Sequence, residues 1–524
     1  MKRIACFVLA MVLCFAFAGC RKTPDQQSLI SSVEQEKDNA VNFNLIYSFG
    51  DTFNPYTAIT SHNRQICKLL FDPLVKTDNE FNTELYVAET VTYEANVWTV
   101  KIKNINFSDG TAVTAEDVVY SYSLARDSQT SGYAHTLYEV ASARAVDALT
   151  VEFTLSQRDP YFANLLDFPI LKKGTVGITD SDSVELAPVG CGRYCVAPDR
   201  QSLILNENYY GKKGGIKKIA LMNAPDSESV AHYVEVGKAD IYYTDISDGN
   251  IVRMSGKRED VNINHLVYLG INSSYGLLNT KEARYAISSA INRKEICQSA
   301  YFNNALAANG FFNPLFEPTK PMQTLNSSAN EEITVENLKQ IGYNSLDSEG
   351  FYVNSSNKRL SFTLLVNKEN QSRVLAARLI SEQCRAAGIE IKVVEYTYEQ
   401  YVQALQSGGF QLYLGEVKVL PNMDISQLVK AGGSAAYGVS AEGQPVVDEN
   451  GEVKPTQNVC IKMMDAYHKG ECSIGDVAGA LLTEMPQIPI CYRNGLLFYS
   501  SKVTSEVEAS ASDIFYSIEN YTFK

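Results

Sequence analysis

The chain has 524 residues, with 46 Lys and Arg against 60 Asp and Glu, which gives a formal net charge of −14 at pH 7. This length exceeds what one hydrophobic core usually supports, so we expect at least two lobes. The acidic balance argues against nucleic acid as a partner, because nucleic-acid binding requires basic patches on the protein surface.

The first twenty residues have the pattern of an export signal. Lys2 and Arg3 precede an apolar run over 4–18, which is too short for a comfortable membrane span. Small residues then abut Cys20, as in bacterial lipoprotein signals, where the cysteine thiol is acylated. We therefore predict lipidation at Cys20, followed over 21–40 by a polar, flexible tether. The alternative is an ordinary secretory signal that is cleaved two residues earlier.

No later stretch approaches the length of a transmembrane helix. We therefore expect the body of the protein to be soluble and to stand on the extracytoplasmic face of the cell membrane. An acidic body is not attracted to an anionic membrane surface, so the N-terminal lipid would have to hold it there.

Eight cysteines follow Cys20, and an even number outside the cell permits disulfides, although the sequence does not give their pairing. Cys191 and Cys195 are four residues apart, so they form either a bridge or two small apolar fillers. No second pair of cysteines or histidines has the spacing of zinc ligands. We therefore predict neither a metal site nor a cofactor.

The folded body is expected to begin with a strand. Phe43, Leu45 and Tyr47 alternate with polar residues, which is typical of a half-buried strand. Pro55 follows and favours an extended conformation at Asn54, so a turn should leave this strand.

The most informative stretch is VWTVKIKNINFSDGTAVTAEDVVYSYSLAR at 97–126. Its first six residues alternate and predict a strand. The triplet Ser-Asp-Gly at 108–110 predicts a turn, because Gly tolerates positive φ and Asp bonds its own backbone. Thr114 can then cap a helix, with Asp117 at the position of the acidic partner in a capping box.

This strand, turn and capped helix resemble the signature of the bacterial extracellular solute-binding proteins of family 5. These are the oligopeptide-, dipeptide- and nickel-type receptors of ABC importers, and their usual wording is FSDGxPLTAEDVVYS. Further stretches are similar to the family: APVGCGRY at 187–194, YLGIN at 268–272 and PQIPICY at 486–492. The similarity runs from about Asn42 to the C-terminus and is poor over 431–475.

The resemblance implies an α/β fold with two lobes, of the periplasmic-binding-protein-like type II (cluster C-like), with mixed sheets flanked by helices and a ligand cleft between the lobes. After the signal (1–20) and the tether (21–40), we expect lobe I over 41–57, 187–268 and 485–524, an extension subdomain of lobe I over 58–186, and lobe II over 269–484.

The clearest physical argument concerns residues 362–414. Three alternating strands are separated there by two helices that Asn370 and Thr397 can cap. Such strand–helix alternation predicts a parallel sheet with right-handed crossovers. In parallel sheets, ligands bind beyond the carboxyl ends of the strands, and the third strand ends in Gly415, Glu416, Val417 and Lys418.

A shorter unit of the same kind is predicted in lobe I. A strand around 216–221 is followed by a helix that Asp226 can cap and Gly237 can end, and then by a strand at 240–243. We expect a β-α-β unit whose ligand side lies at 243–245.

Candidate ligand-binding residues come from these strand ends and from the positions that match the family. They are Phe49, Asn54, Tyr268, Asn272, Gly415, Glu416, Val417, Lys418 and Tyr492.

Glu416 is the most specific of these candidates. The family usually has Trp at this position, so a stacking surface has been exchanged for a charge. A carboxylate here can accept a hydrogen bond from a cationic ligand group, or it can form a structural ion pair with Lys418. Peptide receptors of the family hold the ligand amine with an Asp a few residues later, where this chain has Val419. Peptide nevertheless remains the ligand class that the resemblance favours.

The resemblance implies a receptor that captures a small solute by lobe closure and delivers it to the permease subunits of an ABC importer. We find no G-x-S-x-G, H-E-x-x-H or Walker A motif, and the five histidines are isolated in the sequence, so no enzyme activity is predicted. The alternatives are a secreted peptide hydrolase and a sensory or adhesive surface lipoprotein.

Overall fold

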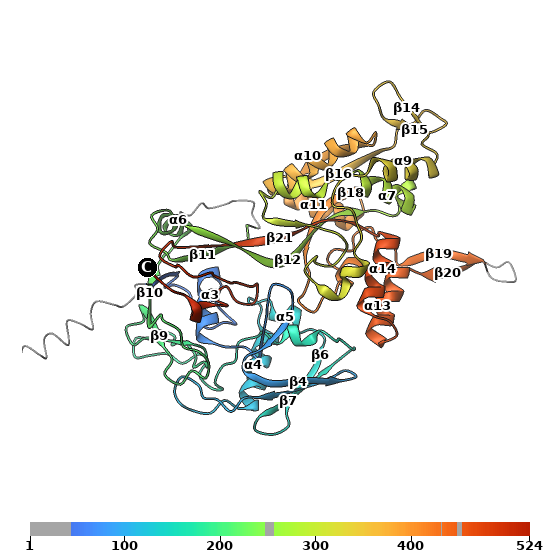
Figure 1. Cartoon of the computed structure of the whole chain (residues 1–524). Coiled ribbons are helices and arrows are strands. Elements are labelled where there is room, and N and C mark those ends of the chain that lie inside the picture. Colours follow the sequence, from blue (N-terminus) through green and yellow to red (C-terminus); the bar gives the residue numbers. More distant parts are fainter. Residues whose placement is uncertain (1–42, 247–255, 431, 448–452) are drawn as a thin grey trace, which may run out of the picture.

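A computed structural model describes residues 43–246, 256–430, 432–447 and 453–524 (Figure 1). Two lobes lie at opposite ends of one long pair of strands, β12 (Lys257–Ile271) and β21 (Ile488–Tyr499). The expected two-lobed α/β fold is therefore confirmed.

The stretch at 97–126 folds as its sequence predicts. It contains β5 (Val97–Ile102) and α4 (Ala115–Asp127), with Gly110 at a φ of 84° in the turn between them. Thr114 and Asp117 form a complete capping box at the start of α4. Strand β5 lies inside an antiparallel sheet of order β4-β5-β7-β6, whose other members are β4 (Ala88–Glu94), β6 (Val140–Ala145) and β7 (Thr150–Leu155).

A second small sheet has the order β1-β10-β9-β8. Its strands are β1 (Phe43–Tyr47), β8 (Tyr194–Val196), β9 (Ser202–Leu205) and β10 (Lys218–Asn223). Helix α6 (Ser227–Glu235) follows β10 and is capped by Asp226, as predicted. Strand β11 (Ile241–Thr244), however, pairs with β21 in another sheet, so the predicted single-sheet β-α-β unit is wrong. Local caps and periodicity define each element but not the sheet that a strand joins.

The central sheet has the order β11-β21-β12-β18-β16-β17 and therefore runs through both lobes. Its strands β16 (Ser361–Asn367), β17 (Glu390–Tyr396) and β18 (Leu412–Lys418) are parallel, as the sequence predicts. They are connected by α10 (Gln371–Ala386) and α11 (Tyr398–Ser407), which begin at the predicted caps.

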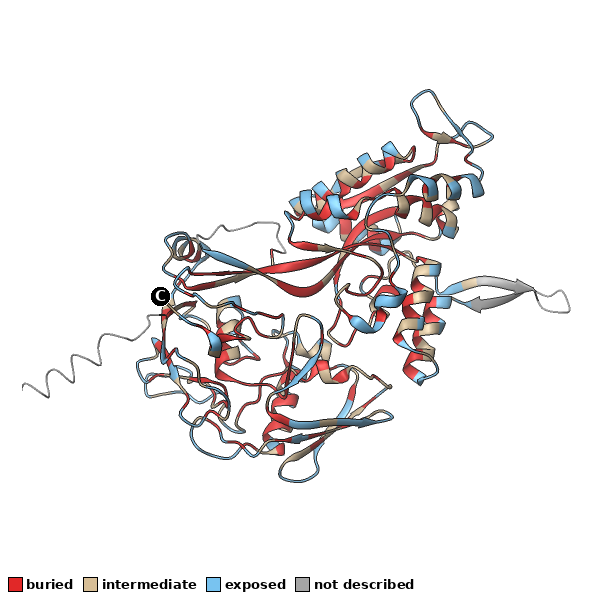
Figure 2. Cartoon of the chain, in the orientation of Figure 1, coloured by how far each residue is buried: buried red, intermediate tan, exposed pale blue. Residues whose placement is uncertain are grey.

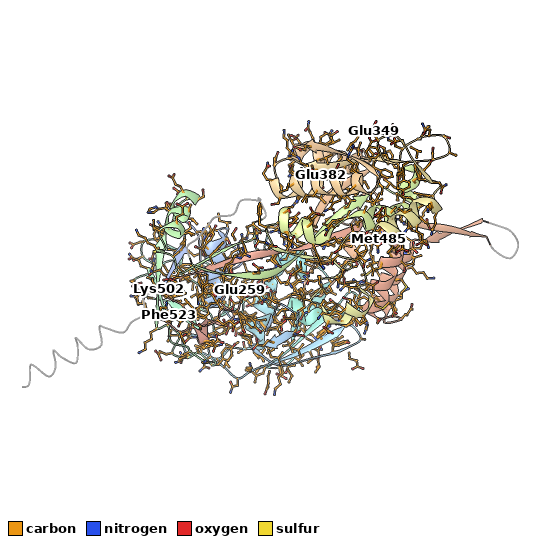
Figure 3. The ribbon with its side chains drawn as sticks, turned by 45° about the horizontal axis from the view of Figure 1, so that its top comes forward. Glu259, Glu349, Glu382, Met485, Lys502 and Phe523 are labelled. Atoms are coloured by element: carbon orange, nitrogen blue, oxygen red, sulfur yellow. The ribbon has the colours of Figure 1, made fainter. Side chains whose placement is uncertain are left out.

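Antiparallel strands join this parallel half to lobe I. Strand β18 pairs with β12, and β12 pairs with β21 along most of its length. Strand β13 (Ala305–Ala307) adds to the other edge of β21. In Figure 3, Met485, which precedes β21, and Lys502, which follows it, lie at opposite ends of the strand pair that joins the lobes. Glu259 of β12 lies at the same end as Lys502, as the antiparallel pairing of β12 with β21 requires.

The remaining elements cover these sheets or connect them. In lobe I and its extension they are α3 (Ser61–Leu70), β2 (Val75–Thr77), β3 (Thr83–Leu85), α5 (Tyr133–Thr136) and the 3-10 turns η1 (Phe162–Leu165) and η4 (Ile518–Asn520). From residue 276 to 353 they are η2 (Gly276–Asn279), α7 (Lys281–Ala290), α8 (Arg293–Ser299), η3 (Glu317–Met322), α9 (Glu331–Gln340), β14 (Ser345–Leu346) and β15 (Tyr352–Val353). The chain then adds α12 (Ser426–Val429), the projecting hairpin β19 (Glu442–Val447) and β20 (Val453–Gln457), α13 (Val459–Lys469) and α14 (Ile474–Glu484).

Successive side chains of β12 point to opposite faces of the sheet, which separates two cores in lobe II. Val267 and Leu269 face one core together with Leu414, whereas Leu266 and Tyr268 face the other. In lobe I, residues from β1, α3, β5 and the C-terminal segment share one core. Figure 2 shows that the crossing strands are buried along most of their length. The lobe boundaries given above stay a prediction.

The predicted signal (1–20), the lipidation site Cys20 and the tether (21–40) lie outside the described residues. Within the described ranges, no helix is both long and apolar enough to span a membrane.

The capping box of α4 gives the first testable prediction. Asp117 Oδ2 accepts from Thr114 N at 2.9 Å, and Asp117 Oδ1 accepts from Lys173 N at 2.9 Å. Replacing Asp117 with Ala should therefore lower the free energy of unfolding by about 2 kcal/mol, because a cap is lost and the Lys173 amide loses its partner. Trp98, the only tryptophan of the chain, is buried on the neighbouring β5, and its fluorescence during urea denaturation measures this change.

Glu116→Ala is the matched control. The Glu116 side chain is 70% exposed, and its ion-pair partner among the described residues is Lys173, whose Nζ lies 3.2 Å away, so the loss of this pair should cost about 0.5 kcal/mol or less. Equal effects of the two substitutions would contradict the assigned role of Asp117.

Candidate functional site

The predicted ligand-side run begins at the end of β18. Gly415 and Val417 are buried, whereas the side chains of Glu416 and Lys418 point to the other face of the strand. In the register with β12, Lys418 lies opposite His265 and Glu416 lies opposite Val267. Both charged side chains therefore stand on one face, next to the strands that join the lobes.

The Glu416 carboxylate is bound by three protein side chains. Its Oε1 accepts from Arg493 Nε and Nη2 at 3.0 and 2.7 Å, and it lies 2.8 Å from His265 Nδ1. Its Oε2 accepts from Arg373 Nη2 at 3.0 Å. These partners come from β21, β12 and the first turn of α10, so one carboxylate connects four elements.

This cluster is largely withdrawn from water. The Glu416 side chain is 6% exposed and that of Arg493 is 3% exposed. Burial alone would raise the pKa of Glu416, but the hydrogen bond from His265 and the charges of Arg493 and Arg373 hold it well below its usual range. Glu416 is therefore ionised at any pH near neutrality.

The expected alternative partner of Glu416, Lys418, is wrong. In the described part of the chain, the ion-pair partners of Glu416 are Arg493, Arg373 and His265. A role of Glu416 in contacting ligand stays a prediction, but its carboxylate already has protein donors on both oxygens.

Lys418 has different surroundings. Its side chain is exposed, and no hydrogen bond or ion pair reaches its ammonium within the described ranges. Desolvation by the surrounding protein nevertheless lowers the pKa of Lys418. The charge of Asp167 opposes this shift, and the charge of Lys68 adds to it.

Lys68 and Asp167, two of the charged groups that influence Lys418, belong to lobe I. Lys68, on α3, donates to Tyr133 Oη at 3.3 Å, and Tyr133 Oη donates to the carbonyl of Asp167 at 3.3 Å. Asp167 is half-buried, and desolvation raises its pKa although Lys68 and Lys418 oppose that shift.

Direct contacts join the loop after β18 to lobe I. Asn422 Nδ2 donates to Asp159 Oδ2 at 2.7 Å, and Asn164 Nδ2 donates to the carbonyl of Pro421 at 3.0 Å. The loop after β18 therefore rests against residues 158–164, and burial at this contact raises the pKa of Asp159 to about 6.

Four other candidate side chains use their polar atoms inside the protein. Asn272 Nδ2 donates to the carbonyls of Gly408 and Phe410, and Asn54 Oδ1 accepts from Tyr56 N. Tyr268 Oη lies 3.2 Å from Tyr413 Oη, and Tyr492 Oη donates to the carbonyl of Phe311. All four side chains are buried, and their contact with a ligand stays a prediction.

Phe49 is 65% exposed and lines a cavity of about 410 Å³ in lobe I. The walls of this cavity include Tyr47, Phe53, Leu186 and Pro188. The structure therefore does not bring Phe49 together with the end of β18.

Arg493, Arg373 and His265 were not predicted as partners of Glu416. One signal was available: Arg493 interrupts the apolar run IPICYRNGLLF, and a charge inside a buried strand requires an opposite charge. His265 carries no such signal, because its partner lies 151 residues away in sequence.

The eight cysteines in the described part of the chain are free, so Cys191 and Cys195 do not form a bridge. Within the same residues, no group of three or more His, Cys, Asp or Glu side chains is arranged to hold a metal ion.

Comparison with known proteins connects this geometry to a family. The family model "Bacterial extracellular solute-binding proteins, family 5 Middle" matches residues 80–429. The oligopeptide-binding protein AppA of Bacillus subtilis is 26% identical over 377 residues, which cover 68% of this chain and 67% of AppA. The nickel-binding periplasmic protein of Escherichia coli K12 is 22% identical over 267 residues, about half of each chain.

Solved structures show the same fold. A nickel ABC transporter protein from Bacillus halodurans has a TM-score of 0.70 at 17% identity, covering 90% of this chain and 98% of its own. The unliganded open form of MppA, a periplasmic murein tripeptide binding protein, has a TM-score of 0.68 at 18% identity, covering 89% and 94%.

Replacing Glu416 with Gln tests the buried cluster. The change keeps the shape of the side chain but leaves Arg493 and Arg373 without a negative partner, so the free energy of unfolding should fall by about 3 kcal/mol. Urea denaturation followed by circular dichroism measures the effect. The control is Glu395→Gln, because Glu395 forms an exposed ion pair with Arg378. Loss of this pair should lower the free energy of unfolding by about 0.5 kcal/mol.

The contribution of Glu416 to the free energy of unfolding depends on pH with a definite sign. Because the folded-state pKa of Glu416 lies below its ordinary value of 4.5, its stabilising contribution is fully present above pH 4.5 and is lost as the pH falls further. The difference in stability between the wild type and Glu416→Gln should therefore shrink between pH 5 and pH 3. A difference that is constant over this interval would contradict the ionised cluster.

Proposed function

Because the chain belongs to the bacterial extracellular solute-binding proteins of family 5, we propose that it is the substrate-binding protein of an ABC importer that captures a peptide between its two lobes. The observation that carries this proposal is the two-lobed fold, in which β12 and β21 join the lobes and the parallel strand β18 ends beside them. Ligands of open α/β sheets bind at such strand ends.

Mechanically, the fold supports closure around a ligand. The two lobes are joined by β12 and β21, and their contact surfaces meet again at Asn422–Asp159 and Asn164–Pro421. Two-lobed proteins with such connections close by hinge motion, and a ligand that contacts both lobes stabilises the closed form. The closed form would then dock on the permease subunits.

Peptide is the proposed ligand class. AppA, which aligns with 68% of this chain, is described as oligopeptide-binding, and MppA as a murein tripeptide binding protein. The nickel-type relatives favour a metal chelate as the second candidate.

We also propose that the protein is anchored to the extracytoplasmic face of the membrane by a lipid on Cys20. The support is the charged start, the short apolar run and the small residues before this cysteine. Residues 21–40 would then act as the tether.

Peptide binding should stabilise and compact the protein. With tryptic peptides of casein at about one hundred times the dissociation constant, the free energy of unfolding should rise by about 2.7 kcal/mol. Thermal denaturation measures this gain, and small-angle X-ray scattering should show a smaller radius of gyration. An unchanged radius at saturation would contradict closure.

New peptide fragments in mass spectra would favour a hydrolase, and no binding at all would favour a sensory or adhesive lipoprotein.

Lipidation predicts a change in fractionation. In cells that express Cys20→Ala, the protein should leave the membrane fraction, because the acylated thiol is the proposed anchor. Cys195→Ala is the control and should not alter fractionation. Membrane retention of Cys20→Ala at the wild-type level would remove the lipid anchor from the proposal.

A further inference from the structure

The cavity in lobe I that Phe49 lines has the size of a small-molecule site. Its volume of about 410 Å³ lies within the range of roughly 300–1,000 Å³ that such sites occupy in proteins. The end of β1, the last residue of α3 and strand β8 meet around it. All described residues that line it lie between Tyr47 and Arg200, so the strands that join the lobes do not contribute to it. The cavity therefore does not depend on closure of the lobes.

The walls of this cavity are mostly apolar. The rings of Tyr47 and Phe53 stack, with centroids 6.1 Å apart and an angle of 21° between the ring planes. Leu186 and Pro188 add aliphatic surface. Phe49 is 65% exposed, so a ligand that covers its ring would remove apolar surface from water. Such walls favour a ligand with an aromatic body.

Three charged side chains are among the described residues that line the cavity, and none of them offers a buried, unpaired charge. The Asp51 carboxylate accepts from Thr60 N at 2.8 Å and from Thr60 Oγ1 at 2.6 Å. Arg200 pairs with Asp180, and Glu185 is exposed to solvent. A charged ligand group would lose its own water here without gaining a desolvated counter-charge, so the cavity favours a neutral ligand.

The Tyr47 hydroxyl is the polar group that is left for a ligand. Tyr47 lines the cavity and is 6% exposed, and no hydrogen bond from the described part of the chain reaches its Oη. Tyr194, another tyrosine of the wall, donates its Oη–H to the carbonyl of Ile216 at 2.9 Å. Because buried tyrosines usually have a hydrogen-bond partner, a ligand oxygen is a suitable partner for Tyr47.

We propose that this cavity binds a small neutral aromatic molecule that carries a hydroxyl or carbonyl group, and that Tyr47 Oη forms a hydrogen bond with this group. Phe49 and Phe53 contact the aromatic body. The site is separate from the proposed peptide cleft, so the protein can hold both ligands at once.

The test uses N-phenyl-1-naphthylamine, a neutral probe whose fluorescence rises in apolar surroundings. At pH 7, naphthalene, 1-naphthol and 1-naphthoate, which share one ring system, are used to displace this probe from the purified protein. The wild type should bind 1-naphthol at least about tenfold more tightly than 1-naphthoate, because the carboxylate would be buried without a counter-charge.

Tyr47→Phe removes the hydroxyl and keeps the ring. This variant should bind 1-naphthol about three- to tenfold more weakly than the wild type, with a change of less than about twofold for naphthalene, which forms no hydrogen bond. It should unfold at the wild-type temperature or above, because the hydroxyl has no partner among the described residues.

A second pair of variants tests the position of the site. Leu186→Trp should fill the cavity and abolish probe binding. The matched control is Leu346→Trp on β14, where the leucine is 56% exposed, and this variant should bind the probe as the wild type does. Thermal denaturation of both variants checks that they are folded.

Several results would overturn the inference. They are no saturable probe binding by the wild type, equal affinities for 1-naphthol and 1-naphthoate, wild-type affinity of Tyr47→Phe for 1-naphthol, or probe binding by folded Leu186→Trp. Saturating casein peptides should leave the probe bound, whereas displacement by them would place the probe in the peptide cleft and overturn the separate site. The proposed peptide-binding function stands or falls by its own experiment, because the cavity lies within one lobe.

Discussion

The ion-pair cluster around Glu416 is the interaction on which the junction between the lobes depends. One carboxylate at the end of β18 receives Arg493 from β21, His265 from β12 and Arg373 from α10. A buried arginine without a counter-charge is costly, so each arginine fixes the position of the strand or helix that carries it. The strands that cross between the lobes are thereby tied to the parallel half of the sheet.

The same cluster distinguishes the two charged residues at the end of β18. Both oxygens of Glu416 are occupied by Arg493, Arg373 and His265, whereas no hydrogen bond or ion pair from the described residues reaches the exposed Lys418 ammonium. Beside this strand end, the contacts of Asn422 and Asn164 hold the loop after β18 against lobe I.

Much of the fold could be predicted because its signals are local. The capping box of Thr114, the caps at Asn370 and Thr397, and the alternating strands around residues 362 and 412 depend on neighbours within a few positions. The site was less predictable. The position of the strand end followed from topology, but the alternative that paired Glu416 with Lys418 was wrong, because sequence proximity was the available guide.

The sequence by itself determined the family, the parallel half of the central sheet and the strand end where charged residues gather. Only the tertiary structure decided that β11 joins β21 instead of β10, and that Arg493 and His265 meet Glu416. The physical reason is the range of the interactions. Caps and periodicity act within one element, whereas the partners of Glu416 lie 43 to 151 positions away from it and depend on how whole strands are ordered in the sheet.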